Sequence, residues 1–213
     1  MATTAEYARF APLFRNLVRR EVRQRYKGSL LGLAWTLLNP LVVVLTYSLV
    51  FHYMWRVVNI PHYPLFLFTG LAVWTFFLGG AQLAASSLVA NGNLVKKVRF
   101  PREILPAAAI SANAVTAGAM FAVALPLCLV ISTRSYAPLV VLPVFVALIA
   151  VLTLGFGLLL AALNVYFRDV EHILAAVSMP WFFLTPIFYT FETLPGIQAR
   201  PALLDVMYYG NPV

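Results

Sequence analysis

The chain has 213 residues, of which 62% are hydrophobic and 10% are charged, and its mean hydropathy is +0.87. A soluble domain of this size cannot bury so much apolar surface and still keep a wettable exterior. A formal charge of +8 is compatible with a nucleic-acid partner, but in a membrane protein excess cations hold loops on the cytoplasmic side instead. We therefore predict an all-α integral membrane protein that binds no nucleic acid.

A basic amphipathic helix is expected first, over residues 9–27. Apolar residues recur there at helical spacing, as at Phe10, Leu13, Phe14 and Leu17. A helix of this type lies in the plane of the lipid headgroups. Two roles remain open for it: a simple membrane anchor, or a basic collar that grips a pyrophosphate-bearing lipid through planar guanidinium groups. The candidate cations are Arg15, Arg19, Arg20, Arg23, Arg25 and Lys27.

Five runs free of Lys, Arg, Asp and Glu follow, and each can hold one span of about 20 apolar residues. We expect spans over residues 30–55, 64–89, 104–132, 138–164 and 172–190. The stretch 193–210 is broken by proline and glycine, so two short re-entrant or interfacial helices are expected there. Residues 1–213 would thus form a single transmembrane domain.

The distribution of cations predicts the orientation of the spans. With the N-terminus in the cytoplasm, twelve of the fifteen Lys and Arg residues fall in cytoplasmic segments. Two of these segments are loops between spans, one around Lys96 and one around Arg168. We therefore predict a multi-pass protein with a cytoplasmic N-terminus.

The loop "NGNLVKKVRFPREILP" (91–106) places a basic patch between two apolar runs. Three interpretations compete: a loop held at the membrane surface, a nucleic-acid contact, or a docking element for a partner. Pro101 is suited to the first position of a helix, where its missing N–H is not needed. Glu103 would then lie in the first turn, where the helix dipole favours an anion. The end of this loop is therefore expected to begin the third span.

Motifs for catalysis and ATP binding are absent from the sequence. It contains no G-x-x-x-x-G-K-[ST], no G-x-S-x-G, no H-E-x-x-H and a single cysteine, Cys128. No acid lies in the middle of an expected span, as an ion-coupled carrier would require. We expect no catalytic residue, cofactor or metal in this chain, and an energy source elsewhere. A membrane-embedded lipid or sugar transferase is the less favoured alternative, because Glu103, Asp169 and Glu171 are explicable as helix-end charges.

Aromatic residues make up 14% of the chain. Most should face lipid, but a ring can also stack on the apolar face of a sugar without a fixed set of hydrogen bonds. The candidates for lining such a path are Phe51, Tyr53, Trp74, Phe77, Trp181, Phe188 and Tyr189.

Three stretches together resemble one family: "RREVRQRYKGSLLGLAWTLLNPL" (19–41), "NGNLVKKVRFPREILP" (91–106) and "ALNVYFRDVEHIL" (162–174). They are similar to the permease subunits of type-2 ABC exporters, especially bacterial exporters of O-antigen and teichoic acid. The resemblance implies a homodimer in the bacterial inner membrane, with six spans per subunit and two re-entrant helices before the last. It also implies a separate ATPase subunit that uses ATP and Mg²⁺, and a polysaccharide substrate carried on undecaprenyl pyrophosphate.

The same resemblance assigns roles to individual segments. It makes helix 9–27 the interface helix beside the gate where the lipid enters, and 193–210 the periplasmic gate. The chain stops at Val213, where the sixth span would begin, so the last span is expected to be missing. The same architecture could instead export capsule polysaccharide, an oligosaccharide or a drug. The residues that would couple to the ATPase are Asn93, Leu94, Val95, Lys96, Lys97, Val98, Arg99, Phe100, Pro101, Arg102, Glu103, Arg168 and Asp169.

Overall fold

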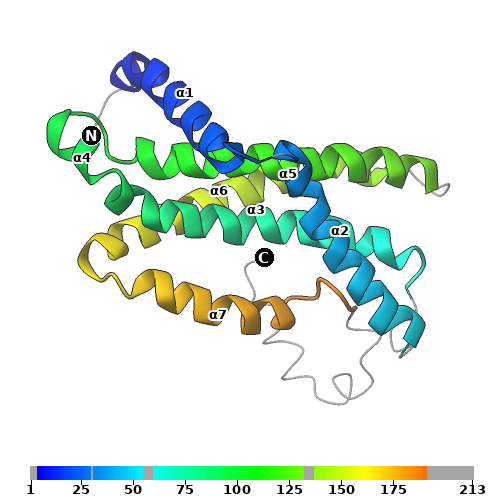
Figure 1. Cartoon of the computed structure of the whole chain (residues 1–213). Coiled ribbons are helices and arrows are strands. Elements are labelled where there is room, and N and C mark those ends of the chain that lie inside the picture. The colour runs from blue at the N-terminus through cyan, green and yellow to red at the C-terminus, as the bar shows by residue number, and fades with distance from the viewer. Residues whose placement is uncertain (1–3, 30, 55–59, 132–136, 191–213) are drawn as a thin grey trace.

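The computed structural model describes residues 4–29, 31–54, 60–131 and 137–190, and every regular element in these ranges is a helix (Figure 1). Four helical segments are long and apolar enough to cross a membrane, namely Trp35–Met54, Tyr63–Ala90, Ile104–Ile131 and Leu142–Tyr166. The prediction of an all-α membrane protein is confirmed for these ranges. In chain order the elements are α1 (Thr4–Tyr26), the 3₁₀ turn η1 (Gly32–Ala34), α2 (Trp35–Tyr47), the π-helix η2 (Ser48–Met54), α3 (Tyr63–Ala90), α4 (Gly92–Lys97), α5 (Ile104–Ile131), α6 (Ala137–Tyr166) and α7 (Val170–Leu184).

Helix α3 forms the centre of the bundle (Figure 1). It packs against α2, α5, α6 and α7. Half of its most apolar window is buried inside the protein, against 11 to 28% for the other three long spans. A helix that is apolar on all sides belongs either in a core or in lipid. Helix α3 is therefore the core helix, and the other spans keep apolar faces on the outside of the bundle.

Small residues let α6 approach α3 closely. A Cβ atom added at Gly80 would lie 2.8 Å from Cγ2 of Thr153, and one added at Gly157 would lie 2.9 Å from Cβ of Ala84. Lipid tails are as apolar as the side chains, so helix association in a bilayer depends on close packing of this kind. The absence of a side chain at these two glycines therefore allows α6 to pack tightly against the central helix.

The fifth expected span, 172–190, differs from the structure. Helix α7 has 15 residues and ends at Leu184. Thr185 is extended (φ −84°, ψ 130°), because the following Pro186 disfavours the helical conformation of the residue before it. At 1.5 Å per residue α7 is about 22 Å long, shorter than a hydrocarbon core of about 30 Å. The expected re-entrant stretch 193–210 lies outside the described residues.

The first expected span, 30–55, is helical but irregular. It consists of η1, α2 and the π-helix η2 placed end to end. Pro40 lies inside α2 and has no N–H for the helical hydrogen-bond ladder. Only 11% of the apolar window of this span is buried. The span therefore lies at the edge of the bundle, against α3 and α5.

Candidate functional site at the charged end of the bundle

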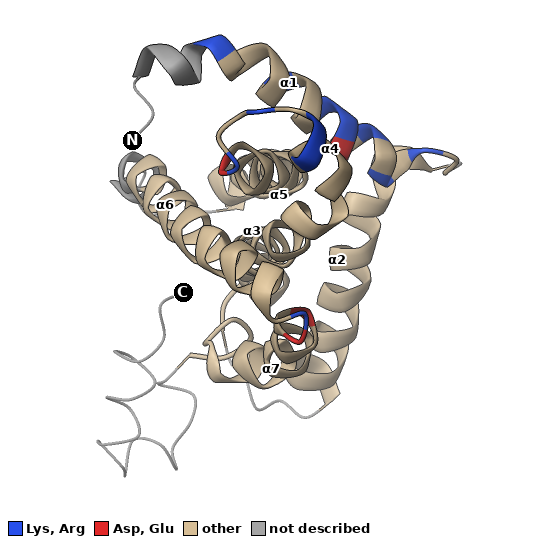
Figure 2. Cartoon of the chain, turned by 90° about the vertical axis from the view of Figure 1, so that its left-hand side faces the viewer, with Lys and Arg blue, Asp and Glu red and all other residues tan. Residues whose placement is uncertain are grey.

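The charged side chains of the described ranges belong to three segments: α1 with Lys27 directly after it, residues 96–103 and residues 168–171. Figure 2 shows the latter two at one end of the bundle, where α4 and the turn between α6 and α7 face the viewer, with α1 running past this end. Ionised side chains are costly inside hydrocarbon, so this end meets water or headgroups. Among the described residues, no group of three or more His, Cys, Asp or Glu is placed to hold a metal ion.

The predicted coupling segment, residues 93–103, has two different faces. Lys96, Lys97 and Arg99 are exposed. The apolar side chains on its other face join a cluster between α1 and α5, in which Leu94, Val95 and Phe100 pack against Leu17, Ile104, Leu105 and Ala108. The cations are thus presented outward from a segment that the rest of the protein holds firmly in place.

Helix α5 begins at Ile104, three residues later than expected from Pro101. A turn comes first: the N–H of Ile104 donates to the carbonyl of Pro101 (3.2 Å), and that of Leu105 donates to the carbonyl of Arg102 (3.2 Å). Glu103 lies directly before the helix rather than within its first turn. The tight bonding of this turn connects the basic segment rigidly to α5.

The second predicted coupling site is the turn between α6 and α7, where Arg168 and Asp169 are exposed. Next to it, Asn164 is only 1% exposed. Its Nδ2 donates to the carbonyl of Ala85 in α3 (2.9 Å) and to Oε1 of Glu171 at the start of α7 (2.6 Å). This turn is therefore fixed to the end of α3, beside the start of the other coupling segment.

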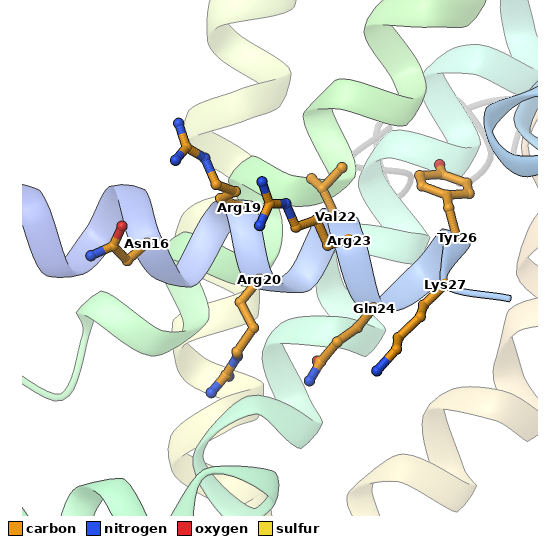
Figure 3. Close-up of a pocket in the computed structure, with 8 residues that line it drawn as sticks. All are labelled: Asn16, Arg19, Arg20, Val22, Arg23, Gln24, Tyr26 and Lys27. Carbon is orange, nitrogen blue, oxygen red and sulfur yellow. The ribbon is translucent and has the colours of Figure 1, made fainter.

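Helix α1 does not rest on lipid alone. Its apolar face, including Leu17, packs against the start of α5 and the coupling segment. Its polar side borders an open pocket of about 840 Å³ (Figure 3), lined by Asn16, Arg19, Arg20, Val22, Arg23, Gln24, Tyr26 and Lys27. Arg19 and Arg23 point to one side of the helix, while Arg20, Gln24 and Lys27 point to the opposite side. The helix thus presents cations on both sides of its axis.

The six predicted lipid-facing cations, five in α1 and Lys27 directly after it, fall into two groups. Arg20 donates to Oε1 of Glu21 (2.9 Å) and to Oδ1 of Asn91, and the Nδ2 of Asn91 donates to the carbonyl of Ser87 (2.8 Å). Arg20 therefore ties α1 to the residue where α3 ends and the coupling segment begins. Arg25 is tied to α5, as described next. The other four, Arg15, Arg19, Arg23 and Lys27, are exposed and bind no described side chain.

Arg25 reaches the spanning helices from the end of α1. Its Nη1 donates to Oδ1 of Asn113 (3.2 Å) and to Oγ1 of Thr116 (2.9 Å), both in α5. The hydroxyl of Tyr26 lies 3.3 Å from the same Thr116 oxygen. Arg25, Tyr26 and Thr116 all line a second pocket of about 450 Å³, which is also bordered by α2 and α3.

Six of the seven aromatic residues predicted to line a sugar path form one series of contacting rings. Phe182 joins Phe188 (5.9 Å between ring centres) to Trp74 (5.5 Å), and Trp181 joins Trp74 (5.9 Å) to Phe77 (5.3 Å). Phe51 and Tyr189 contact Phe188. Phe77 is 1% exposed, whereas the seventh residue, Tyr53, is 65% exposed. The rings hold η2, α3 and α7 together, and their role in a sugar path stays a prediction.

Three asparagines that organise this end were not among the predicted site residues. Asn91, Asn113 and Asn164 each bind a backbone carbonyl of α3. The sequence does carry a signal for two of them, since Asn113 and Asn164 are the sole Asn or Gln residues within α5 and α6 respectively. An amide inside an apolar helix has to find hydrogen-bond partners.

Comparison with known proteins gives a consistent set of matches. The profile of the family described as ABC-2 type transporter matches residues 12–213. The chain is 37% identical over 204 residues to the O-antigen export system permease protein RfbA of Myxococcus xanthus, covering 93% of this chain and 76% of that protein. Two proteins of the same name from Klebsiella pneumoniae are 31% and 32% identical over 184 residues, covering 84% of this chain and 69% of each.

Proposed function

Because this chain belongs to the ABC-2 type transporter family, we propose that it is the permease subunit of an ATP-driven exporter of an O-antigen-type polysaccharide. The chain is a multi-pass membrane protein and a transport subunit. Its relatives carry the name of O-antigen export permeases, which supports this substrate class over capsule polysaccharide, oligosaccharide or drug. No observation on the described residues favours the transferase alternative.

The two-faced coupling segment is the observation on which the transport mechanism rests. ATP and Mg²⁺ bind to a separate ATPase subunit, which docks on the exposed cations Lys96, Lys97 and Arg99. Movement of that subunit reaches the spans because the apolar face of the segment is packed against α1 and α5. The exposed turn at Arg168 and Asp169, fixed to α3 through Asn164, provides a second contact.

The proposed substrate is a polysaccharide linked to undecaprenyl pyrophosphate, and its headgroup meets the cations of α1. The exposed guanidinium groups of this helix, Arg25 included, can each bind two phosphate oxygens. Two copies of the chain form the exporter in the bacterial inner membrane, with the charged end of the bundle in the cytoplasm. The cation excess of that end supports this orientation.

Charge reversal of the coupling segment tests the proposal. The variant Lys96→Glu, Lys97→Glu and Arg99→Glu should insert normally but lose ATPase activity coupled to the permease, because the docking surface now repels its partner. The matched control is Lys96→Arg, Lys97→Arg and Arg99→Lys, which keeps every charge. ATP hydrolysis of the co-purified complex is measured in both. Equal coupling in the two variants would show that this surface is not the docking site.

The substrate class has its own test. The chain and its partner ATPase are expressed in a bacterium that lacks its O-antigen exporter, and O-antigen on the cell surface is detected by gel electrophoresis and antibody. Restored surface O-antigen supports the proposal. Intact assembly of the complex without any surface O-antigen would contradict it.

A further inference from the structure

The pocket of about 450 Å³ beside Arg25 contains a cation that hydrogen bonds hold in place, and polar and apolar side chains both line it. Arg25, Ser29 and Asn39 contribute polar groups, whereas Trp35 and Leu71 contribute apolar surface. Tryptophan is typical of the level at which headgroups meet the hydrocarbon. The pocket lies between the end of α1, α2, α3 and α5. Its composition fits a molecule with an anionic head and an apolar body.

Asn113 fixes the orientation of the Arg25 guanidinium. Asn113 is 3% exposed, and its Nδ2 donates to the carbonyls of Thr75 and Phe76 in α3, both at 3.0 Å. Because the amide nitrogen of Asn113 donates to α3, its amide oxygen faces Arg25 and accepts from it. Gly79 makes room for this arrangement, since a Cβ there would lie 3.2 Å from Nδ2 of Asn113. The position of Arg25 is thus determined by the core of the bundle.

The remaining edge of the guanidinium is available to a ligand. The hydrogen bonds of Arg25 to Asn113 and Thr116 use Nη1 alone. No described residue accepts from Nε or Nη2, and the described part of the chain provides no carboxylate partner for Arg25. These two nitrogens form one of the edges that bind an oxyanion with two parallel hydrogen bonds. A phosphate group satisfies this geometry and neutralises the charge.

We propose that this pocket binds the phosphate of a lipid headgroup, with Arg25 as the binding residue and Asn113 and Thr116 as positioning residues. The inference deepens the proposed function, since it selects one of six cations and one pocket as the place where the headgroup of the lipid-linked substrate binds. A membrane phospholipid presents the same phosphate chemistry, and the experiment separates the two sources.

The test measures lipid affinity for the complete complex with its ATPase. Undecaprenyl pyrophosphate and phosphatidylglycerol are titrated separately in detergent, and bound lipid is quantified by native mass spectrometry. Arg25→Lys keeps the charge but loses the pair of parallel donors Nε and Nη2, so the affinity for undecaprenyl pyrophosphate should fall about tenfold. Arg9→Lys is the matched control, because Arg9 is an exposed arginine of the same helix that does not line the pocket. The affinity of the Arg9→Lys complex for either lipid should not change.

Thr116 tests the positioning role through its hydroxyl group, which accepts from Arg25. Thr116→Val should weaken pyrophosphate binding, and Thr116→Ser, which keeps the hydroxyl, should restore it. A purely structural role would not distinguish Val from Ser in lipid affinity when both proteins are equally stable.

The outcomes separate this inference from the proposed function. Weaker binding of undecaprenyl pyrophosphate in Arg25→Lys, but not in Arg9→Lys, supports it. The same pattern with phosphatidylglycerol alone would overturn the assignment to the substrate headgroup. Unchanged affinity in Arg25→Lys, in a complex that still exports O-antigen, would overturn the inference and leave the proposed function standing. A wild-type complex that exports no O-antigen would instead count against the proposed function.

Discussion

Gly157 of α6 lies at a close approach between α6 and the central helix α3, so it should not tolerate even a methyl group. In Gly157→Ala the new Cβ would lie 2.9 Å from Cβ of Ala84 and 2.9 Å from Cδ1 of Ile110. Carbon atoms in favourable contact are about 3.5–4.0 Å apart. The Ile110 methyl can rotate away, but the Ala84 Cβ is fixed to the backbone of α3. The helices must therefore separate, at a cost of about 1–3 kcal/mol.

Gly155, two residues earlier in α6, provides the control. A Cβ at Gly155 meets nothing within 4 Å. Both alanines gain the same helix propensity, about 1 kcal/mol, so this contribution cancels when the two variants are compared. Gly157→Ala should thus be less stable than Gly155→Ala by about 1–3 kcal/mol. Denaturant unfolding in detergent, followed by circular dichroism, measures the difference. Equal stability of the two variants would refute the close packing of α3 and α6.

Two further predictions concern the asparagines. A double-mutant cycle with Arg20→Ala and Asn91→Ala should give a coupling energy of about 1 kcal/mol in the free energy of unfolding, because the two side chains share a part-exposed charged hydrogen bond. If the losses of stability in the two single variants simply add in the double variant, α1 is not tied to the coupling segment. Asn164→Asp should lose about 1–3 kcal/mol, since it places a second carboxylate 2.6 Å from Glu171 Oε1. Adding Glu171→Gln should recover much of this loss, and no recovery would contradict the contact.

The positions of the long helices were predictable because the information is local. A charge-free apolar run of sufficient length can only be satisfied in a membrane or in a core, and the expected spans 64–89, 104–132 and 138–164 agree closely with α3, α5 and α6. The end of α7 was predictable in principle from Pro186, which limits the residue before it. The expected bound at residue 104 agrees with the start of α5, whereas the helix start inferred from Pro101 was three residues too early, because a tight turn precedes the helix.

The site was predictable only in part. The three charged segments are evident in the sequence, but their contacts are not, because the partners lie far away along the chain. Arg20 and Asn91 are 71 residues apart, and Arg25 and Asn113 are 88 apart. The helical spacing of α1 predicted an apolar face correctly, yet both lipid and protein can cover such a face. The structure shows that α5 and the coupling segment cover part of it.

The sequence by itself determined that this is a helical membrane protein, where its long helices lie, and which segments carry the charges that cannot enter hydrocarbon. These properties depend on composition and on the length of apolar runs. Only the tertiary structure decided that α3 is the core helix and that Arg25, of the six candidate cations within residues 15–27, is held at a pocket by Asn113. The physical reason is that core and lipid are equally apolar, so the choice between them depends on close packing and on hydrogen bonds between distant residues.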